Sequence, residues 1–143
     1  MAVGRRTHIR SDGRTLTEAD ILAFAGFTGD FMPLHVDEEY AKTTPYGSRI
    51  VHGNAVLSIA SGLLVRTGAF EDHLGMLGME FRARLAVRPG DTIRAELEQR
   101  SVRLDSTGKR EVVVYDMTVL NQRGETVMEG TWTQLRPAEE SAS

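Results

Sequence analysis

The second half of the chain alternates apolar and polar residues, and this alternation restricts the fold more than any other feature of the sequence. A period of two is typical of strands that bury one face, and short connections join such strands into an antiparallel sheet. Turn residues separate the runs at positions 88–91, 105–108 and 121–124. The predicted strands are centred on Met79–Leu85, Ile93–Leu97, Val113–Val119 and Thr126–Leu135.

The second of these strands changes phase along its length. Ile93 and Leu97 fall on odd-numbered positions, whereas Val102 and Leu104 are the apolar residues beyond Ser101. An extra residue in one strand moves the side chains that follow it to the other face of the sheet. The phase shift therefore predicts a β-bulge near Ser101.

A strongly apolar helical segment precedes the strands, from about Asn54 to Val65. It carries no charged residue, which predicts a buried helix. A buried helix followed by an antiparallel meander packs most simply with the helix across the apolar face of the sheet. The predicted fold class is therefore α+β.

An earlier helix is predicted over Thr15–Thr28. Thr17 can act as its N-cap, and Asp20 three residues later forms a weak variant of the capping box. Gly26 and Gly29 mark its end, because glycine commonly follows the last turn of a helix.

Length and composition narrow the functional classes. With 143 residues the chain has the size of one domain, predicted over residues 1–136, and the polar residues 137–143 are expected to fray. The net charge of −3 gives no broad basic surface for nucleic acid, and no stretch approaches the roughly 20 apolar residues of a membrane span. The sequence has no cysteine and its start has no apolar secretory segment, so we expect a cytoplasmic protein.

Two residues suited to acid–base catalysis follow the first predicted helix. Asp30 and His35 stand in a predicted loop that is bounded by Gly29 and contains Pro33. A carboxylate and an imidazole in such a loop could hold one water and move its proton. In the ordinary alternative, which the spacing alone favours, Asp30 caps a turn and His35 bonds to backbone. No two histidines have metal-ligand spacing with a carboxylate, so no metal site is predicted.

The segment Gly29–His35, with the sequence GDFMPLH, resembles the Gly-Asp-x-Asn-Pro-Leu-His signature of MaoC-like dehydratases and R-specific enoyl-CoA hydratases. The resemblance extends through Ala25–Thr28 and Ile50–Gly53 and covers roughly residues 17–97. It implies a hotdog fold, in which an antiparallel sheet wraps a long central helix, and a homodimer. It also implies an enzyme that hydrates a 2-enoyl thioester of coenzyme A or acyl carrier protein to the R-3-hydroxyacyl product, or runs the reverse dehydration, without a cofactor.

In that family the residues that match Asp30 and His35 bind the catalytic water. The resemblance places the backbone N–H of Gly53 at the thioester oxygen, where attack on C3 develops an enolate charge. Gly53 opens the buried helix, where unpaired N–H groups and the helix dipole favour a negative charge. Alternatively, Gly53 is a packing glycine. Ser61 resembles a serine near the substrate, or it bonds to a carbonyl of its own helix.

The chain departs from the signature at position 32, where Met replaces the usual Asn. Met32 either lacks the amide that orders the loop or the water, or contacts an unusual acyl group. His52 precedes Gly53 and is expected to be structural. The candidate contacts to the phosphates of the ligand are the basic residues Lys42, Arg49, Arg82 and Arg84.

Two other functions remain open from the sequence. A hotdog thioesterase would also place a carboxylate and a helix N-terminus at the thioester. A non-catalytic hotdog subunit would bind acyl chains or only dimerise, and Met32 is compatible with that function. The close pair of Asp30 and His35 favours a hydratase over a thioesterase.

Overall fold

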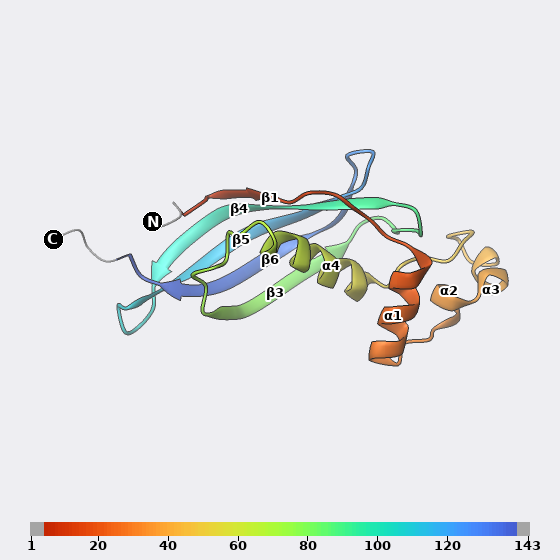
Figure 1. Cartoon of the computed structure of the whole chain (residues 1–143), viewed down its shortest axis with the longest axis horizontal. Helices are drawn as coiled ribbons and strands as arrows, with labels where there is room; N and C mark the ends of the chain where they lie inside the picture. Colours follow the sequence, from red (N-terminus) through yellow and green to blue (C-terminus); the bar gives the residue numbers. More distant parts are fainter. Residues whose placement is uncertain (1–4, 140–143) are drawn as a thin grey trace.

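The computed structural model describes residues 5–139 and consists of a curved antiparallel sheet with one long helix along its face and three shorter helices. Figure 1 shows α4 lying along the sheet, and α1 to α3 beyond one end of it. Within residues 5–139 six strands form the sheet, in the order β1-β4-β5-β6-β3, and β2 also pairs with β4. The elements are β1 (His8–Arg10), β2 (Arg14–Thr15), α1 (Glu18–Thr28), α2 (Pro33–Val36), α3 (Glu38–Lys42), α4 (Gly53–Val65), β3 (Gly75–Ala83), β4 (Thr92–Leu104), β5 (Arg110–Leu120) and β6 (Thr126–Pro137).

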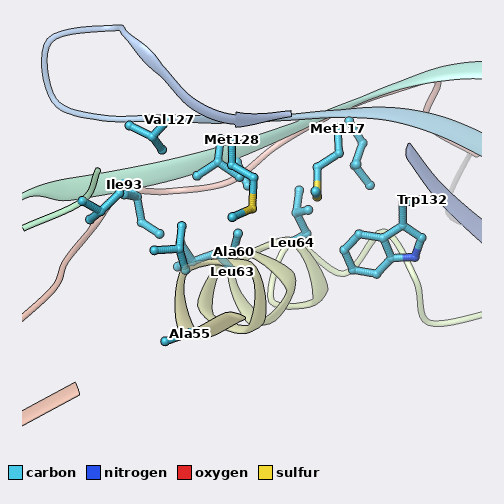
Figure 2. Packing of buried hydrophobic residues seen from close by; sticks show 14 of the residues in the cluster. Ala55, Ala60, Leu63, Leu64, Ile93, Met117, Val127, Met128 and Trp132 are labelled. Carbon is cyan, nitrogen blue, oxygen red and sulfur yellow. The ribbon is translucent and has the colours of Figure 1, made fainter. Parts of the chain in front are cut away.

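The core lies between α4 and the sheet, which confirms the predicted α+β packing. Figure 2 shows Leu63 and Leu64 of α4 close to side chains of the sheet that include Met117 and Trp132. The sheet covers only one face of α4. The other face carries a stripe of exposed residues at helical spacing, namely Asn54, Ser58, Gly62 and Val65.

Several local predictions are confirmed. The Asp20 carboxylate accepts a hydrogen bond from the Thr17 N–H at 2.9 Å at the start of α1. Gly29 follows α1 with a φ of 82°, a left-handed conformation that suits glycine. In β4 the register shifts between Gln99 and Ser101, so the predicted bulge is present and Arg100 is the extra residue.

The expected half-buried character of the strand Met79–Leu85 is wrong for the single chain. Of the residues of β3, only Met79 is partly buried, while Phe81 and Ala83 are exposed, and Leu85 lies beyond the end of the strand. The reason is topological, because β3 is an edge strand that pairs with β6 and not with its sequence neighbour β4. The short strands β1 and β2 were not predicted either.

A polar cluster closes the end of the sheet opposite α1 to α3. The Glu111 carboxylate accepts hydrogen bonds from Arg5 at 2.9 Å and from the buried Arg136 at 2.8 Å. Arg5 also donates to the carbonyl of Pro137 at 2.6 Å. Pro137 is therefore the last residue of β6 and not the start of a frayed tail, and residues 140–143 of that predicted tail lie outside the described residues. None of the described helices is long and apolar enough to cross a membrane.

Beside this cluster, His73 makes stability depend on pH. Burial lowers the pKa of its imidazole below the usual 6.5, although the neighbouring Asp72 opposes this shift, and Arg136 and Arg5 add to it. The unfolded chain binds the proton near pH 6.5, whereas the folded chain binds it only at lower pH, so acid favours unfolding. We expect the free energy of unfolding in urea to fall more between pH 7.5 and 5.5 for the parent than for His73→Gln. Equal losses in the two proteins would contradict this assignment.

Candidate active site

The candidate site lies where the end of α1, the short helix α2 and the start of α4 meet. Gly29 turns the chain out of α1, and Met32 has the extended backbone that a following proline requires. Pro33 then takes the first position of α2, where its missing N–H leaves no bond unmade. His35 therefore lies on a single helical turn. The prediction that it lies in a loop is wrong.

The His35 imidazole is buried, with 8% of its surface exposed, and its orientation is set by backbone. Its Nδ1 lies 2.8 Å from the carbonyl oxygen of Ile50. A carbonyl oxygen only accepts, so Nδ1 carries the hydrogen and Nε2 of the neutral ring keeps its lone pair. His35 thus presents a proton acceptor on the side of the ring away from Ile50.

A second imidazole, that of His52, packs directly on the first. The two rings are stacked, with centroids 3.8 Å apart and planes 27° apart, and Phe24 contacts His52 from another side. His52 is 2% exposed, and its Nε2 lies 2.9 Å from the carbonyl oxygen of Asp30. Sequence reasoning gave His52 no partner, because its contacts come from Phe24, Asp30 and His35, which only the fold brings to it.

The structure brings the predicted pair together. The Asp30 carboxylate is exposed, and its side-chain oxygen lies within 4.8 Å of ring nitrogens of His35 and His52. Its Oδ1 accepts a hydrogen bond from the Met32 N–H at 3.3 Å, and the Asp30 N–H donates to the Thr28 hydroxyl at 3.2 Å. The backbone around Asp30 is therefore held by local hydrogen bonds, while its carboxylate is open to solvent.

A carboxylate and two imidazoles at this spacing raise the question of a metal ion. An imidazole binds a metal through a lone pair in the plane of the ring, at about 2.0–2.1 Å. The rings of His35 and His52 are stacked and nearly parallel, so their lone pairs cannot converge on one ion in this arrangement. The geometry suits a polar substrate or a water better than a metal.

Gly53 begins α4 beside this group. Within the described part of the chain, its N–H has no hydrogen-bond acceptor, and the helix N-terminus carries a partial positive charge. A Cβ built on Gly53 would meet no atom within 4 Å. Close packing therefore does not explain the glycine, and an exposed donor next to Asp30 and His35 is what the position offers.

The remaining residues predicted near the acyl group are Met32, before α2, and Ser61, within α4. The Met32 side chain is 55% exposed next to Asp30. The Ser61 hydroxyl, two turns along α4, donates to the carbonyl of Leu57 at 2.8 Å, which is the alternative foreseen for it. Ser61 can still accept a hydrogen bond through its oxygen.

Two of the predicted basic residues lie at the same end of the molecule as the site. Lys42, at the end of α3, is exposed and pairs with Glu39 at 2.8 Å. Arg49 pairs with Glu18 of α1 and Glu38 of α3, and these bonds raise its pKa. Arg49 therefore joins two helices, and Lys42 is the more available cation.

The other two basic residues lie on the sheet face away from α4. Arg82 pairs in register with Glu129, and Met128, the next residue of β6, lies in the core with α4. Neighbouring residues in a strand point to opposite faces, so Glu129 points away from α4, and its cross-strand partner Arg82 points the same way. Arg84 bonds to Glu129 on that side. They line an open groove of about 730 Å³ together with Glu80, Arg100, Asp116 and Glu129.

Comparisons with known proteins agree with the fold and the motif. The family model described as "MaoC like domain" matches residues 4–124. The chain is 33% identical over 129 residues to the (R)-specific enoyl-CoA hydratase of Rhodospirillum rubrum, a match that covers 87% of this chain and 83% of that protein. It is 44% identical over 85 residues to Protein MaoC of Klebsiella aerogenes, covering 59% of this chain but only 25% of that protein. The chain thus spans about a quarter of the length of Protein MaoC.

Solved structures extend the similarity to nearly the whole chain. The monoamine oxidase regulatory protein of Archaeoglobus is 36% identical and superimposes with a TM-score of 0.88, over 93% of this chain and 90% of that one. A protein of Mycobacterium tuberculosis described as having a double hotdog fold is 18% identical, with a TM-score of 0.77 over 93% of this chain and 42% of that one. The second likeness shows the fold alone, and it confirms the predicted hotdog fold.

Proposed function

The chain belongs to the MaoC-like domain family, and from this premise we propose that it adds water to a 2-enoyl thioester to form the R-3-hydroxyacyl thioester, or catalyses the reverse dehydration. One observation carries the proposal. A carboxylate oxygen and an imidazole nitrogen lie within 4.8 Å of each other, next to a helix whose first N–H has no acceptor among residues 5–139. The name of the Rhodospirillum rubrum relative supports the same chemistry.

In this proposal Asp30 and His35 share one water. The lone pair on His35 Nε2 accepts a proton from the water while the Asp30 carboxylate accepts its second hydrogen bond. The water oxygen then forms a bond to C3 of the enoyl group, and the electron pair of the double bond moves toward the thioester oxygen. The proton that His35 has taken is then delivered to C2. The product has gained one whole water molecule, and no group leaves. Because every step is reversible, the same residues would serve the dehydration.

Gly53 serves the other end of the reacting group in this proposal. Attack on C3 places negative charge on the thioester oxygen, and a fixed donor lowers the energy of that state more than water does. The Gly53 N–H is such a donor, and the dipole of α4 acts in the same direction. Glycine also lets the thioester approach the backbone closely.

A direct test follows the fate of crotonyl-CoA mixed with the protein. Loss of the enoyl absorbance without release of thiol supports the hydratase. Release of free thiol would favour the hotdog thioesterase, and the absence of both reactions would favour a non-catalytic acyl-binding subunit. Measuring absorbance and free thiol in one sample distinguishes the three functions.

We also propose that Met32 and Ser61 contact the acyl part of the substrate. The bond that position 32 supplies to Asp30 comes from its backbone N–H, so replacing the usual Asn by Met does not remove it. The exposed thioether of Met32 is then free to contact an apolar acyl group. A wider range of accepted acyl chains in Met32→Ala than in the parent would support this placement.

For the phosphates of the carrier we propose Lys42, Arg49, Arg82 and Arg84. Lys42→Glu should raise the KM for crotonyl-CoA about fivefold and leave kcat within twofold, because an exposed charge pair contributes about 1 kcal/mol to ground state and transition state alike. Arg82→Glu and Arg84→Glu test the outer groove in the same way. Arg49 is less informative, since its reversal also breaks two ion pairs. If the KM stays unchanged in the first three variants, the assignment fails.

We propose a homodimer in which two β3 strands pair edge to edge. β3 leaves one edge without a partner within residues 5–139, and an unpaired edge favours association. Large apolar side chains on and beside this strand are exposed, among them Met76, Leu77, Phe81 and Leu85. Sedimentation at micromolar concentration should give twice the chain mass. Leu77→Lys should shift the protein toward monomer, whereas Leu104→Lys, at an equally exposed leucine of β4, should not.

A further inference from the structure

We infer that His52 is a positioning residue that holds Asp30 and His35 in place relative to Gly53, an inference that rests on the proposed function. His52 donates from Nε2 to the Asp30 carbonyl and stacks on the His35 ring. It is also the N-cap of α4, directly before Gly53, and its own carbonyl accepts the Val56 N–H at 3.0 Å. One residue therefore contacts both members of the water-binding pair and sets the start of the helix that carries the thioester donor.

Of the hydrogen bonds that hold Asp30, the one from His52 has a particular role. The bonds to Thr28 and Met32 join residues two positions away, so they move with the segment and define only its local shape. The bond from His52 reaches across 22 residues and connects this segment to α4. Without it the Asp30 carboxylate keeps its local shape but loses a fixed distance to Gly53.

The chemistry of the ring agrees with this role. A carbonyl partner requires that His52 Nε2 carries the hydrogen, and its buried Nδ1 has no partner within the described residues. Among the described residues, the Asp30 carbonyl is thus the one hydrogen-bond partner of this imidazole. A phenyl ring would retain the stacking on His35 and the tilted contact with Phe24, so what the histidine adds is this one donor.

The inference predicts a loss in turnover that the matching donor restores. His52→Phe keeps an aromatic ring and removes the donor, and we expect kcat to fall about 10- to 100-fold with KM within twofold, since misplacement by about 1 Å can cost a factor of 100. His52→Gln has an amide N–H that can reach the same carbonyl, and it should recover at least half of the lost activity on a logarithmic scale. His73→Phe is the matched control, because His73 is another buried imidazole, far from the site, with one ring nitrogen that has no partner among residues 5–139. It should lower the melting temperature and leave kcat within twofold.

Two further measurements separate positioning from a general loss of structure. In an Asp30→Asn background, His52→Phe should cost less than threefold, because it acts through a residue that is already impaired. Ring ¹⁵N resonances of the unmodified protein should show His52 protonated on Nε2 and unprotonated on Nδ1 at neutral pH, a test that requires no variant to fold.

The outcomes distinguish this inference from the proposed function. If the parent hydrates crotonyl-CoA and His52→Phe keeps its kcat, or if His52 carries its hydrogen on Nδ1, the positioning role is wrong and the proposed function stands. If kcat is as low in His52→Gln as in His52→Phe, the loss of the hydrogen-bond donor is not the cause of the lower turnover. If the parent hydrates no enoyl thioester, the proposed function is wrong and the inference falls with it.

Discussion

Asp30→Asn should reduce the hydratase kcat by at least 100-fold while the protein stays folded. The substitution preserves the shape of the side chain and removes the negatively charged carboxylate, which in the proposal accepts a hydrogen bond from the water. Asp30 is exposed, and the turn around it is held by Gly29 and Pro33, so the melting temperature should change by no more than about 2 °C. Initial rates with crotonyl-CoA and a thermal melt on the same sample measure both quantities.

His35→Ala should cost a similar factor, and the two losses should not add. Both residues act on one water, so Asp30→Asn with His35→Ala should be only slightly slower than the worse single variant, as for residues that act as a unit. Asp12→Asn, at an exposed aspartate between β1 and β2, is the control and should keep the parental rate. Near-native turnover of Asp30→Asn, on a substrate that the parent hydrates, would falsify the mechanism whatever the fold.

Gly130→Ala should destabilise the protein by about 3 kcal/mol or more, the largest effect on stability that we expect from a single methyl group. Gly130 lies in β6 opposite Phe81 of β3. A Cβ built on it would lie 1.8 Å from the carbonyl oxygen of Glu80 and 2.7 Å from the Cα of Phe81. Both atoms belong to the backbone, so β3 would have to move away from β6.

Gly78→Ala is the matched control, because Gly78 lies in the same pair of strands and a Cβ there would meet nothing within 4 Å. It should change the free energy of unfolding by less than about 1 kcal/mol. For Gly130→Ala we expect a fall in melting temperature of about 10 °C. If the two variants have the same melting temperature, the close approach of β3 to β6 at Gly130 does not exclude a larger side chain there.

Where the sequence predicted the fold correctly, the signal was local or periodic. Thr17 and Asp20 are three residues apart and meet at the start of α1, and the apolar phase shift at Ser101 marks the bulge directly. Burial of β3 was predicted wrongly, because alternation shows that a strand has an apolar face but not whether another layer of the fold will cover that face. In the folded chain β3 is an edge strand, and its apolar face stays largely exposed within residues 5–139.

The candidate site was predictable to the extent that its residues share one segment. Asp30 and His35 lie five positions apart within a recognisable motif, and Gly53 opens an apolar helix. His52 lies 22 residues from Asp30, and no periodicity connects the two. Gly130 did have a signal, since an isolated glycine inside a strand pattern indicates close backbone approach. That signal does not name the strand that approaches.

The pairing of β1 with β4 has a consequence for the order in which the chain folds. His8 and Glu98 meet across 90 residues, whereas β4, β5 and β6 are joined by short turns. Each doubling of loop length adds roughly 0.6 kcal/mol to the entropic cost of closing the loop. Pairing His8 with Glu98 therefore costs about 2 kcal/mol more than closing one of the hairpins. The hairpins therefore form before β1 closes onto β4. The segment from α1 to the start of α4 lies within that long loop, so we expect the candidate site to be completed after the hairpins have formed.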